Sequence, residues 1–393
     1  MNLLFIYETD MPTVSLTRNY WLCMSDKYNI RIRFRQLLEV SVDDLNWCNI
    51  LLMIRPNNSL SYRIAISARK AGRLIITCCD DDLLNLPKSY PVLTWQTKGL
   101  IKALNQSDIL ISHSRYIMDK MIKFTFGKRK VYSDTIVRSE DLLVRNYEKE
   151  NYDTVKIVYA AGSMHEKVFE KFVLPALTHV AKKTSKKLSI TFVSVHPKCK
   201  KIGNLVDVNY VQGMPLEDYR KYMEIQKFDI GVSPLEETEF SKCKYFNKYL
   251  EYTLSGVIGI YSNVEPYTYV VEDGVNGFLA DNTVDGWEKK LMYAIENCEL
   301  RILCAKKAQK HVRECFNENY LMSKMVENIP EIQTVIKNQR DCHGFSKWRM
   351  IYRLLRVLEF SYKALFYMKS EGVCSVKRKT ISRMKRLLFM SVL

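Results

Sequence analysis

Short apolar runs alternate with longer amphipathic stretches along the first 150 residues. The runs predict buried strands, and the stretches between them have helical length and spacing. Strands that alternate with helices favour right-handed crossovers and a parallel, doubly wound sheet, whose strands are almost wholly apolar because both faces are covered. The expected strands are residues 3–7, 50–54, 74–79 and 109–111, and the expected helices are residues 14–25, 60–71, 97–106 and 116–124.

A polar stretch at residues 146–153 interrupts this rhythm, and the same alternation then restarts. We expect an N-terminal Rossmann-like domain (1–150), a C-terminal Rossmann-like domain (151–338) and a helical tail (339–393). Two doubly wound domains in series favour a ligand in the cleft between them, because such sheets bind ligands beyond the carboxyl ends of their strands. In the second domain the expected strands are residues 155–160, 188–195, 208–211, 229–232 and 257–261, and the expected helices are residues 165–182, 215–224 and 243–254, with more to about residue 337.

The composition narrows the class of protein. The chain of 393 residues is 47% apolar and 26% charged, a normal globular balance that excludes collagen, long disorder and a disulfide-rich miniprotein. Its formal net charge of +17 predicts an anionic partner, such as a phosphate-bearing ligand, a lipid surface or a nucleic acid. The eleven cysteines are scattered, and no apolar run has the length of a membrane span. We therefore expect a cytoplasmic protein without a structural zinc site or a transmembrane helix.

The turn at residues 159–165 is the first candidate for phosphate binding. It follows an expected strand and opens a helix, so that free N–H groups at the helix start can bind an anion, and Gly162 lets a ligand approach the backbone. His165 stands at the helix start, where it is either a catalytic residue or an ordinary helix cap. A plain strand-to-helix turn is the alternative for the whole segment, since the GxGxxG fingerprint of dinucleotide sites is missing.

The segment 233–252 carries the second candidate. Lys244, Lys248 and Glu251 are spaced i, i+4 and i+7, which places them on one face of the expected helix. The lysines could neutralise a diphosphate, and the carboxylate could accept hydrogen bonds from ribose hydroxyls. An ordinary charged helical face is the alternative.

A series of short motifs continues from that segment. They read Lys248-Tyr-Leu-Glu251-Tyr, Ser255-Gly256-Val-Ile-Gly259, Tyr261-Ser-Asn-Val-Glu-Pro266-Tyr and Glu272-Asp-Gly274-Val-Asn-Gly277-Phe-Leu, with Trp287 beyond them. In this order they resemble the donor-binding domain of the GT-B glycosyltransferases of family 4, densely from about residue 155 to residue 320 and more loosely before it. The resemblance implies a GT-B fold and retaining transfer of a sugar from a nucleoside-diphosphate donor to a saccharide or lipid-linked saccharide. It also implies a role in cell-surface polysaccharide synthesis and no bound metal or other cofactor.

The resemblance also assigns roles to single residues. Glu251 is similar to the glutamate that holds the donor ribose, Gly162 and Ser163 match the turn that meets the diphosphate, and Lys244 matches a basic residue beside the phosphates. Two features depart from the family pattern: the acid expected eight residues before Glu251 is Cys243, and the usual phosphate-binding elements have other residue types. These departures leave a catalytically inactive GT-B scaffold as an alternative.

Three consecutive acids are the candidates for the acceptor side. Asp80, Asp81 and Asp82 directly follow an expected strand, so we expect them at the carboxyl end of the first sheet, opposite the donor. Carboxylates there, Asp81 and Asp82 in particular, could orient or deprotonate an acceptor hydroxyl. Repulsion among adjacent acids tends to raise the pKa of at least one of them. A solvated loop with a helix cap is the alternative, and Arg55, which also follows a strand, is a weaker candidate.

The basic excess is concentrated in the tail, where residues 345–393 carry twelve lysines and arginines against two glutamates. A helical wheel of residues 345–366 places four cations on one side and a tryptophan among the apolar residues of the other. That pattern is typical of an interfacial helix, which predicts an enzyme peripheral on the inner face of the cell membrane. A helix packed on the domains and a helix that binds a partner protein are the alternatives. The expected membrane contacts are Trp348, Arg349, Arg353, Arg356 and Lys363.

A peripheral membrane glycosyltransferase is therefore the leading interpretation. A basic nucleic-acid-binding protein is the alternative from a different class. No RNA-binding or helix-turn-helix signature supports it, and the charge lies on an amphipathic tail rather than beside exposed aromatic residues. We accordingly expect no nucleic-acid partner.

Overall fold

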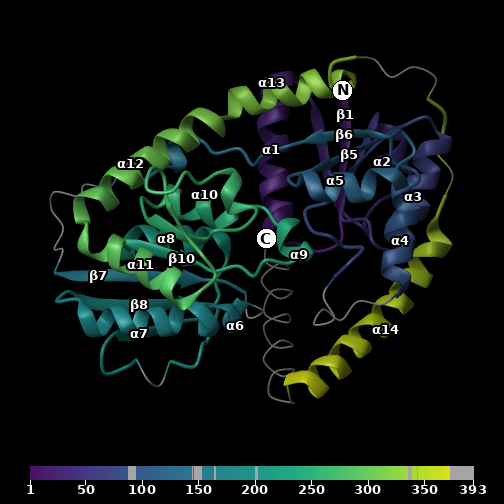
Figure 1. Ribbon diagram of the computed structural model, residues 1–393. Coiled ribbons are helices and arrows are strands. Elements are labelled where there is room, and N and C mark those ends of the chain that lie inside the picture. Colours follow the sequence, from purple (N-terminus) through teal and green to yellow (C-terminus); the bar gives the residue numbers. More distant parts are fainter. Residues whose placement is uncertain are drawn as a thin grey trace.

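The computed structural model describes residues 1–86, 94–143, 145, 153–162, 165–199, 202–334, 339–342 and 344–371. Two parallel six-stranded sheets with flanking helices form two domains that lie side by side (Figure 1). The doubly wound architecture expected in each half of the chain is confirmed.

The first sheet has two hydrophobic cores, one on each face. Leu3 and Phe5 of its first strand pack into one core, and Leu4 and Ile6 pack into the other. This two-sided burial explains why the inner strands are almost wholly apolar. The elements of the first half are β1 (Asn2–Tyr7), α1 (Pro12–Tyr28), β2 (Arg31–Gln36), α2 (Val42–Trp47), β3 (Ile50–Ile54), α3 (Ser59–Lys70), β4 (Leu74–Cys78), α4 (Thr94–Leu104), β5 (Ile109–Ser112), α5 (Arg115–Met121) and β6 (Arg129–Tyr132). The strand order is β2-β1-β3-β4-β5-β6.

The second sheet repeats this plan, with Ile157 of its first strand in one core and Val158 in the other. Its elements are β7 (Thr154–Ala160), α6 (Glu166–Val168), a π-helical segment (Phe169–Val173), α7 (Leu174–Lys183), β8 (Lys187–Val193), β9 (Asp207–Val211), α8 (Leu216–Gln226), β10 (Ile230–Ser233), α9 (Glu239–Lys242), α10 (Asn247–Leu254), β11 (Ile258–Ser262), β12 (Phe278–Ala280), α11 (Val284–Glu296) and α12 (Cys298–Cys315). The strand order is β12-β11-β10-β7-β8-β9.

Three strands that the apolar pattern did not predict are β2, β6 and β12, and all three lie at sheet edges. The strand β2 reads Arg-Ile-Arg-Phe-Arg-Gln, and β6 reads Arg-Lys-Val-Tyr. Charged side chains are common on edge strands, because one edge of the backbone has no neighbouring strand and faces water. Such strands therefore lack the continuous apolar run by which the inner strands were recognised.

The chain changes domain at other places than the polar stretch suggested. Val137 and Leu142 already pack in the core of the second domain. Conversely, α13 (Glu318–Asn328) packs its Leu321 and Met325 into a core of the first domain. There the Tyr20 hydroxyl donates to the Leu321 carbonyl at 2.8 Å. The expected boundaries at 150 and 338 therefore do not match the packing: the chain crosses soon after β6 and returns with α13, as Figure 1 shows.

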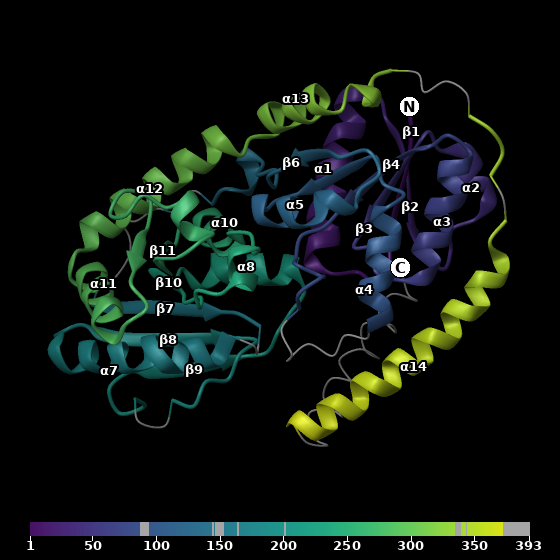
Figure 2. The same cartoon turned by 45° about the vertical axis from the view of Figure 1, so that its right-hand side comes forward.

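The long helix α14 (Ser346–Glu371) lies along the outside of the first domain, beside α3 (Figure 2). Phe345 just before it and Tyr352 within it are buried in one of the cores of that domain. The Arg349 guanidinium donates to the carbonyl oxygen of Val40. The start of the predicted tail helix is therefore part of the first domain.

The cationic side of α14 faces the protein rather than the outside. Arg356 forms an ion pair with Glu8 of the first domain. Lys363 pairs with Glu359 of the same helix, whose carboxylate is buried. The expectation that the cationic side faces outward is therefore wrong for Arg356 and Lys363, because Glu8 and the buried Glu359 attract them. Arg353 is exposed.

Candidate active site

The carboxyl ends of the two sheets approach one another at the domain interface. The Lys120 ammonium, from the first domain, lies 3.6 Å from the Cys243 sulfur of the second. Nearby, the Tyr245 hydroxyl donates to an Asp134 carboxylate oxygen at 3.0 Å. The segments that follow β4, β5 and β10 therefore lie in one region, as the doubly wound architecture predicts.

The turn after β7 leaves open space beside Gly162, where an added Cβ would meet nothing within 4 Å. The His165 N–H donates to the Gly162 carbonyl at 3.0 Å, and the Tyr159 hydroxyl donates to the His165 carbonyl at 2.9 Å. These bonds hold the backbone of Gly162 and His165, while the space beside Gly162 stays free. Ser163 lies outside the described residues, so its contact with a diphosphate stays a prediction.

His165 stands at the start of the helix, with the lysines of the second candidate segment around it. Burial, together with the positive charges of Lys244 and Lys248, lowers the pKa of its imidazole to about 4. The imidazole is therefore neutral at pH 7. The charges of both lysines therefore act on His165, and the role of these three residues in binding an anion stays a prediction.

The two lysines do not share one continuous helix, as their spacing had suggested. The chain leaves helical geometry after α9, and Lys244 lies in the turn before α10. The aromatic residues that follow explain the break: the Tyr245 hydroxyl accepts from the Thr135 N–H at 3.1 Å, and Phe246 is buried in the second core. Burial lowers the pKa of Lys244, and nearby Asp81 partly offsets that effect.

Glu251 lies one helical turn beyond Lys248 and forms an ion pair with it. The Lys248 ammonium also lies over the Tyr219 ring, 5.3 Å from the ring centroid. About a quarter of each side chain of the ion pair is exposed. The pair is therefore accessible, so that a ligand with phosphate and hydroxyl groups can compete for both partners.

Asp80 and Asp81 meet the Arg55 guanidinium, which holds both carboxylates. Asp80 also accepts a hydrogen bond of 2.5 Å from the Thr13 hydroxyl. Burial favours the neutral form of Asp80, but the Arg55 charge outweighs it and lowers the pKa. For Asp81, burial and the Asp80 charge raise the pKa despite Arg55. Asp81 is the more exposed of the two, with Lys244 near it, and is the better placed to meet a ligand.

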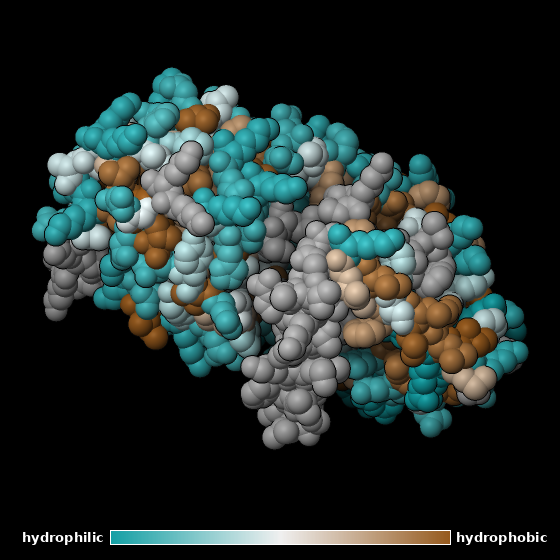
Figure 3. All heavy atoms as spheres, turned by 90° about the horizontal axis from the view of Figure 1, so that it is seen from below, coloured by the Kyte–Doolittle hydropathy of each residue, from teal (hydrophilic) through white to brown (hydrophobic). Residues whose placement is uncertain are grey.

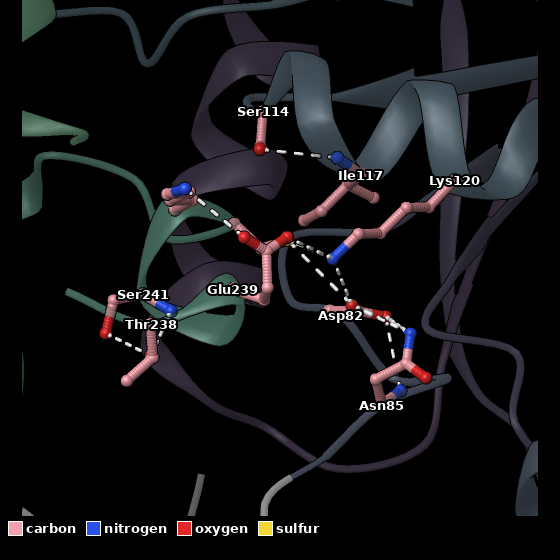
Figure 4. Close-up of polar contacts among 10 residues, drawn as sticks. Asp82, Asn85, Ser114, Ile117, Lys120, Thr238, Glu239 and Ser241 are labelled. Atoms are coloured by element: carbon pink, nitrogen blue, oxygen red, sulfur yellow. Dashed lines mark hydrogen bonds and ion pairs between the residues drawn. The ribbon is translucent and has the colours of Figure 1, made fainter.

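Asp82 lies in the contact between the domains, where its carboxylate faces Lys120 and Asn85 (Figure 4). Its carboxylate is 1% exposed and accepts hydrogen bonds from Lys120 at 3.1 Å and from the Asn85 side chain at 3.0 Å. The Lys120 ammonium also lies 3.8 Å from Glu239 of the second domain. This placement contradicts the expectation that Asp82 acts on an acceptor: it holds Lys120, and through Lys120 the two domains, in place.

Two helix caps position the ends of that contact. The Ser114 hydroxyl accepts from the Ile117 N–H at 3.4 Å at the start of α5, which carries Lys120. Thr238 caps α9, which begins with Glu239, by accepting from the Ser241 N–H at 3.0 Å (Figure 4). Sequence reasoning missed Lys120 because no motif surrounds it, and its partner is thirty-eight positions away.

Arg55 was only a weak candidate, yet it holds the carboxylates of both Asp80 and Asp81. Its backbone has a φ of 47°, in the left-handed region that non-glycine residues seldom adopt.

Among the described residues, no group of three or more His, Cys, Asp or Glu side chains could hold a metal ion.

No protein-family model matches this chain, and no curated protein matches it. Solved structures do. HepE of Anabaena, in complex with UDP and glucose, superposes with a TM-score of 0.61 at 12% identity, over 84% of this chain and 100% of HepE.

Two further structures agree. Sucrose-phosphate synthase of Thermosynechococcus elongatus superposes with a TM-score of 0.58 at 10% identity, over 84% of this chain and 98% of the synthase. The lipopolysaccharide outer core galactosyltransferase WaaB superposes with a TM-score of 0.54 at 12% identity, over 84% and 99%. At these identities the likeness establishes the fold, and the GT-B fold expected from the sequence is confirmed.

Proposed function

We propose that this chain is a glycosyltransferase that moves a sugar from a nucleoside-diphosphate donor to a saccharide or lipid-linked saccharide, with retention at the anomeric carbon, in the synthesis of a cell-surface polysaccharide. One observation carries the proposal: the positive charges of Lys244 and Lys248 act on His165, which bonds to Gly162 at the open turn, and Asp81 lies near Lys244. HepE has been solved with UDP-glucose, which supports a uridine diphosphate sugar as the first donor to test.

On the donor side, the diphosphate takes the space beside Gly162. The Lys244 and Lys248 ammonium groups and the free N–H groups at the helix start neutralise its charge. When Lys248 turns toward phosphate, Glu251 is released to accept hydrogen bonds from the ribose hydroxyls. No metal is needed for this neutralisation, because the lysines and backbone dipoles supply the positive potential.

On the acceptor side, Asp81 receives the acceptor hydroxyl. The bond between the anomeric carbon and the phosphate oxygen breaks, and its electron pair leaves with the diphosphate. The acceptor oxygen forms the new bond on the same face of that carbon from which the diphosphate departs, so that the configuration is retained, and its proton passes to Asp81. A carboxylate with a raised pKa is the better base for this step.

Ligand-dependent thermal unfolding tests the donor site. We expect one of UDP, GDP, ADP and CMP, at a hundredfold its dissociation constant, to stabilise the protein by about 2.7 kcal/mol. Glu251→Gln should reduce that stabilisation, because it replaces the charged carboxylate that accepts from the ribose hydroxyls with a weaker, neutral acceptor. The matched control is Glu224→Gln, which changes an exposed glutamate of α8 and should respond like the wild type.

Two outcomes of these experiments would contradict the proposed function. If none of the four nucleotides raises the unfolding temperature of the wild type, the donor site is absent and the proposal fails. A nucleotide that binds without any sugar being transferred would favour the inactive GT-B scaffold. The burial of Cys243 beside Asp82, where the family pattern has an acid, is the observation that favours this second candidate.

A further inference from the structure

One side of α14 presents a row of large apolar side chains to the outside. These side chains are between 45% and 65% exposed, and they recur at the spacing of one helical stripe. Figure 3 shows hydrophobic residues gathered on the side of the molecule where α14 lies. The row consists of Met350, Leu354, Val357, Leu358, Leu365 and Met368.

The opposite side of the helix is anchored, which prevents the row from turning inward. Tyr352 is 4% exposed and Glu359 is 6% exposed, and Arg356 between them bonds to Glu8 of the first domain. At the start of the helix, the Arg63 guanidinium lies 3.8 Å from the centre of the Trp348 ring. At 100° per residue, the anchored residues lie roughly opposite the apolar row. The row therefore faces away from the domain that holds the helix.

Exposed cations accompany the apolar row. Lys347, Arg353 and Lys369 are exposed along the helix, and the Lys347 ammonium lies 5.9 Å from the centre of the Trp348 ring. Six more lysines and arginines follow in the sequence between residues 372 and 393. An apolar stripe with flanking cations is complementary to a surface with anionic headgroups above an apolar layer. A second copy of the chain would instead bring like charges together across a symmetric contact.

We propose that the apolar row of α14 is the surface by which this protein docks on an anionic lipid membrane. The row enters the interfacial layer, while Lys347, Arg353 and Lys369 meet the headgroups. The inward cations Arg349, Arg356 and Lys363 serve to attach the helix to the first domain and take no part in lipid contact. Among the described residues no helix is long and apolar enough to cross a bilayer, so docking is on the surface. This proposal stands independently of sugar transfer.

Vesicle flotation of the full chain tests it. We compare phosphatidylcholine vesicles with and without about 30% phosphatidylglycerol, at low and high salt. We expect binding only to the anionic vesicles, weakened by salt. The double substitution Leu354→Ser with Leu358→Ser should lower the partition coefficient by about tenfold for each leucine.

The matched control is Ile225→Ser with Leu303→Ser, which changes exposed apolar residues of α8 and α12. It should bind like the wild type. Because all four residues are exposed, every variant should keep the unfolding temperature of the wild type. Unchanged flotation of the α14 variant would overturn the proposal, as would equal binding to neutral vesicles. A wild-type dimer in light scattering that the α14 variant loses would also overturn it and assign the row to a second copy.

Discussion

The half-buried histidine at the start of the helix after β7 makes stability depend on pH in a defined window. In the folded protein burial, together with Lys244 and Lys248, lowers the pKa of His165 to about 4 from an ordinary value of 6.5. Between these two values the unfolded chain binds more protons than the folded protein. Stability therefore rises with pH through this window and is lost as the pH falls from about 6.5 toward 4.

The two pKa values set the size of the effect. At about pH 7.5 the imidazole of His165 is neutral in both states and contributes almost nothing. At about pH 5 it is protonated only in the unfolded chain, which costs the folded state about 2 kcal/mol. His165→Gln should therefore reduce the loss of unfolding free energy between these pH values by about 2 kcal/mol.

Urea unfolding at both pH values measures this difference. The matched control is His196→Gln, which changes an exposed imidazole of the same domain. A bound diphosphate adds negative charge beside His165, raises its pKa and should shrink the pH dependence of the wild type. If His165→Gln leaves the pH dependence as steep as in the wild type, then the imidazole does not lie in the positive field that the donor site requires.

Further substitutions test other parts of the structure by urea unfolding and nucleotide titration. Gly162→Val should leave stability within about 0.5 kcal/mol, since the space is open, but it should abolish nucleotide binding; Gly203→Val, at an equally open glycine, should preserve both. Lys120→Met should cost about 2–3 kcal/mol, because it leaves the buried Asp82 carboxylate without its cation; an unchanged unfolding free energy would refute the domain contact. Tyr252→Phe should cost about 1–2 kcal/mol, because its hydroxyl donates to a buried strand carbonyl at 2.9 Å, and a neutral result would contradict that bond.

The inner architecture of both domains was predictable from the sequence. Strands such as β3, buried on both faces, are apolar at every position, and the helices between them carry a regular polar side. Edge strands such as β2 were not predicted, because their side chains are only partly buried and therefore need not form a continuous apolar run. The return of α13 to the first domain was not predicted either, because the amphipathic pattern of a helix does not indicate against which core it packs.

The candidate site was predictable where neighbours in sequence are neighbours in space. Gly162 and His165 lie in one turn, and Lys248 and Glu251 lie one helical turn apart. The pairing of Asp82 with Lys120 depends on two distant segments meeting, and no local pattern records it. The orientation of α14 was predicted wrongly for a similar reason. A helical wheel separates the two sides of a helix but does not show which side packs against the rest of the protein.

Turnover of a nucleotide sugar is the direct test of whether this protein transfers a sugar from a nucleoside-diphosphate donor. Purified protein is incubated with a panel of nucleoside-diphosphate sugars and a membrane extract that supplies lipid-linked acceptors, and the released nucleoside diphosphate is measured. We expect the wild type to consume one donor. Lys244→Ala should lose most of this activity, because it removes the charge that stabilises the departing diphosphate. A donor that binds to the wild type but is never consumed would contradict this expectation and identify the protein as an inactive scaffold.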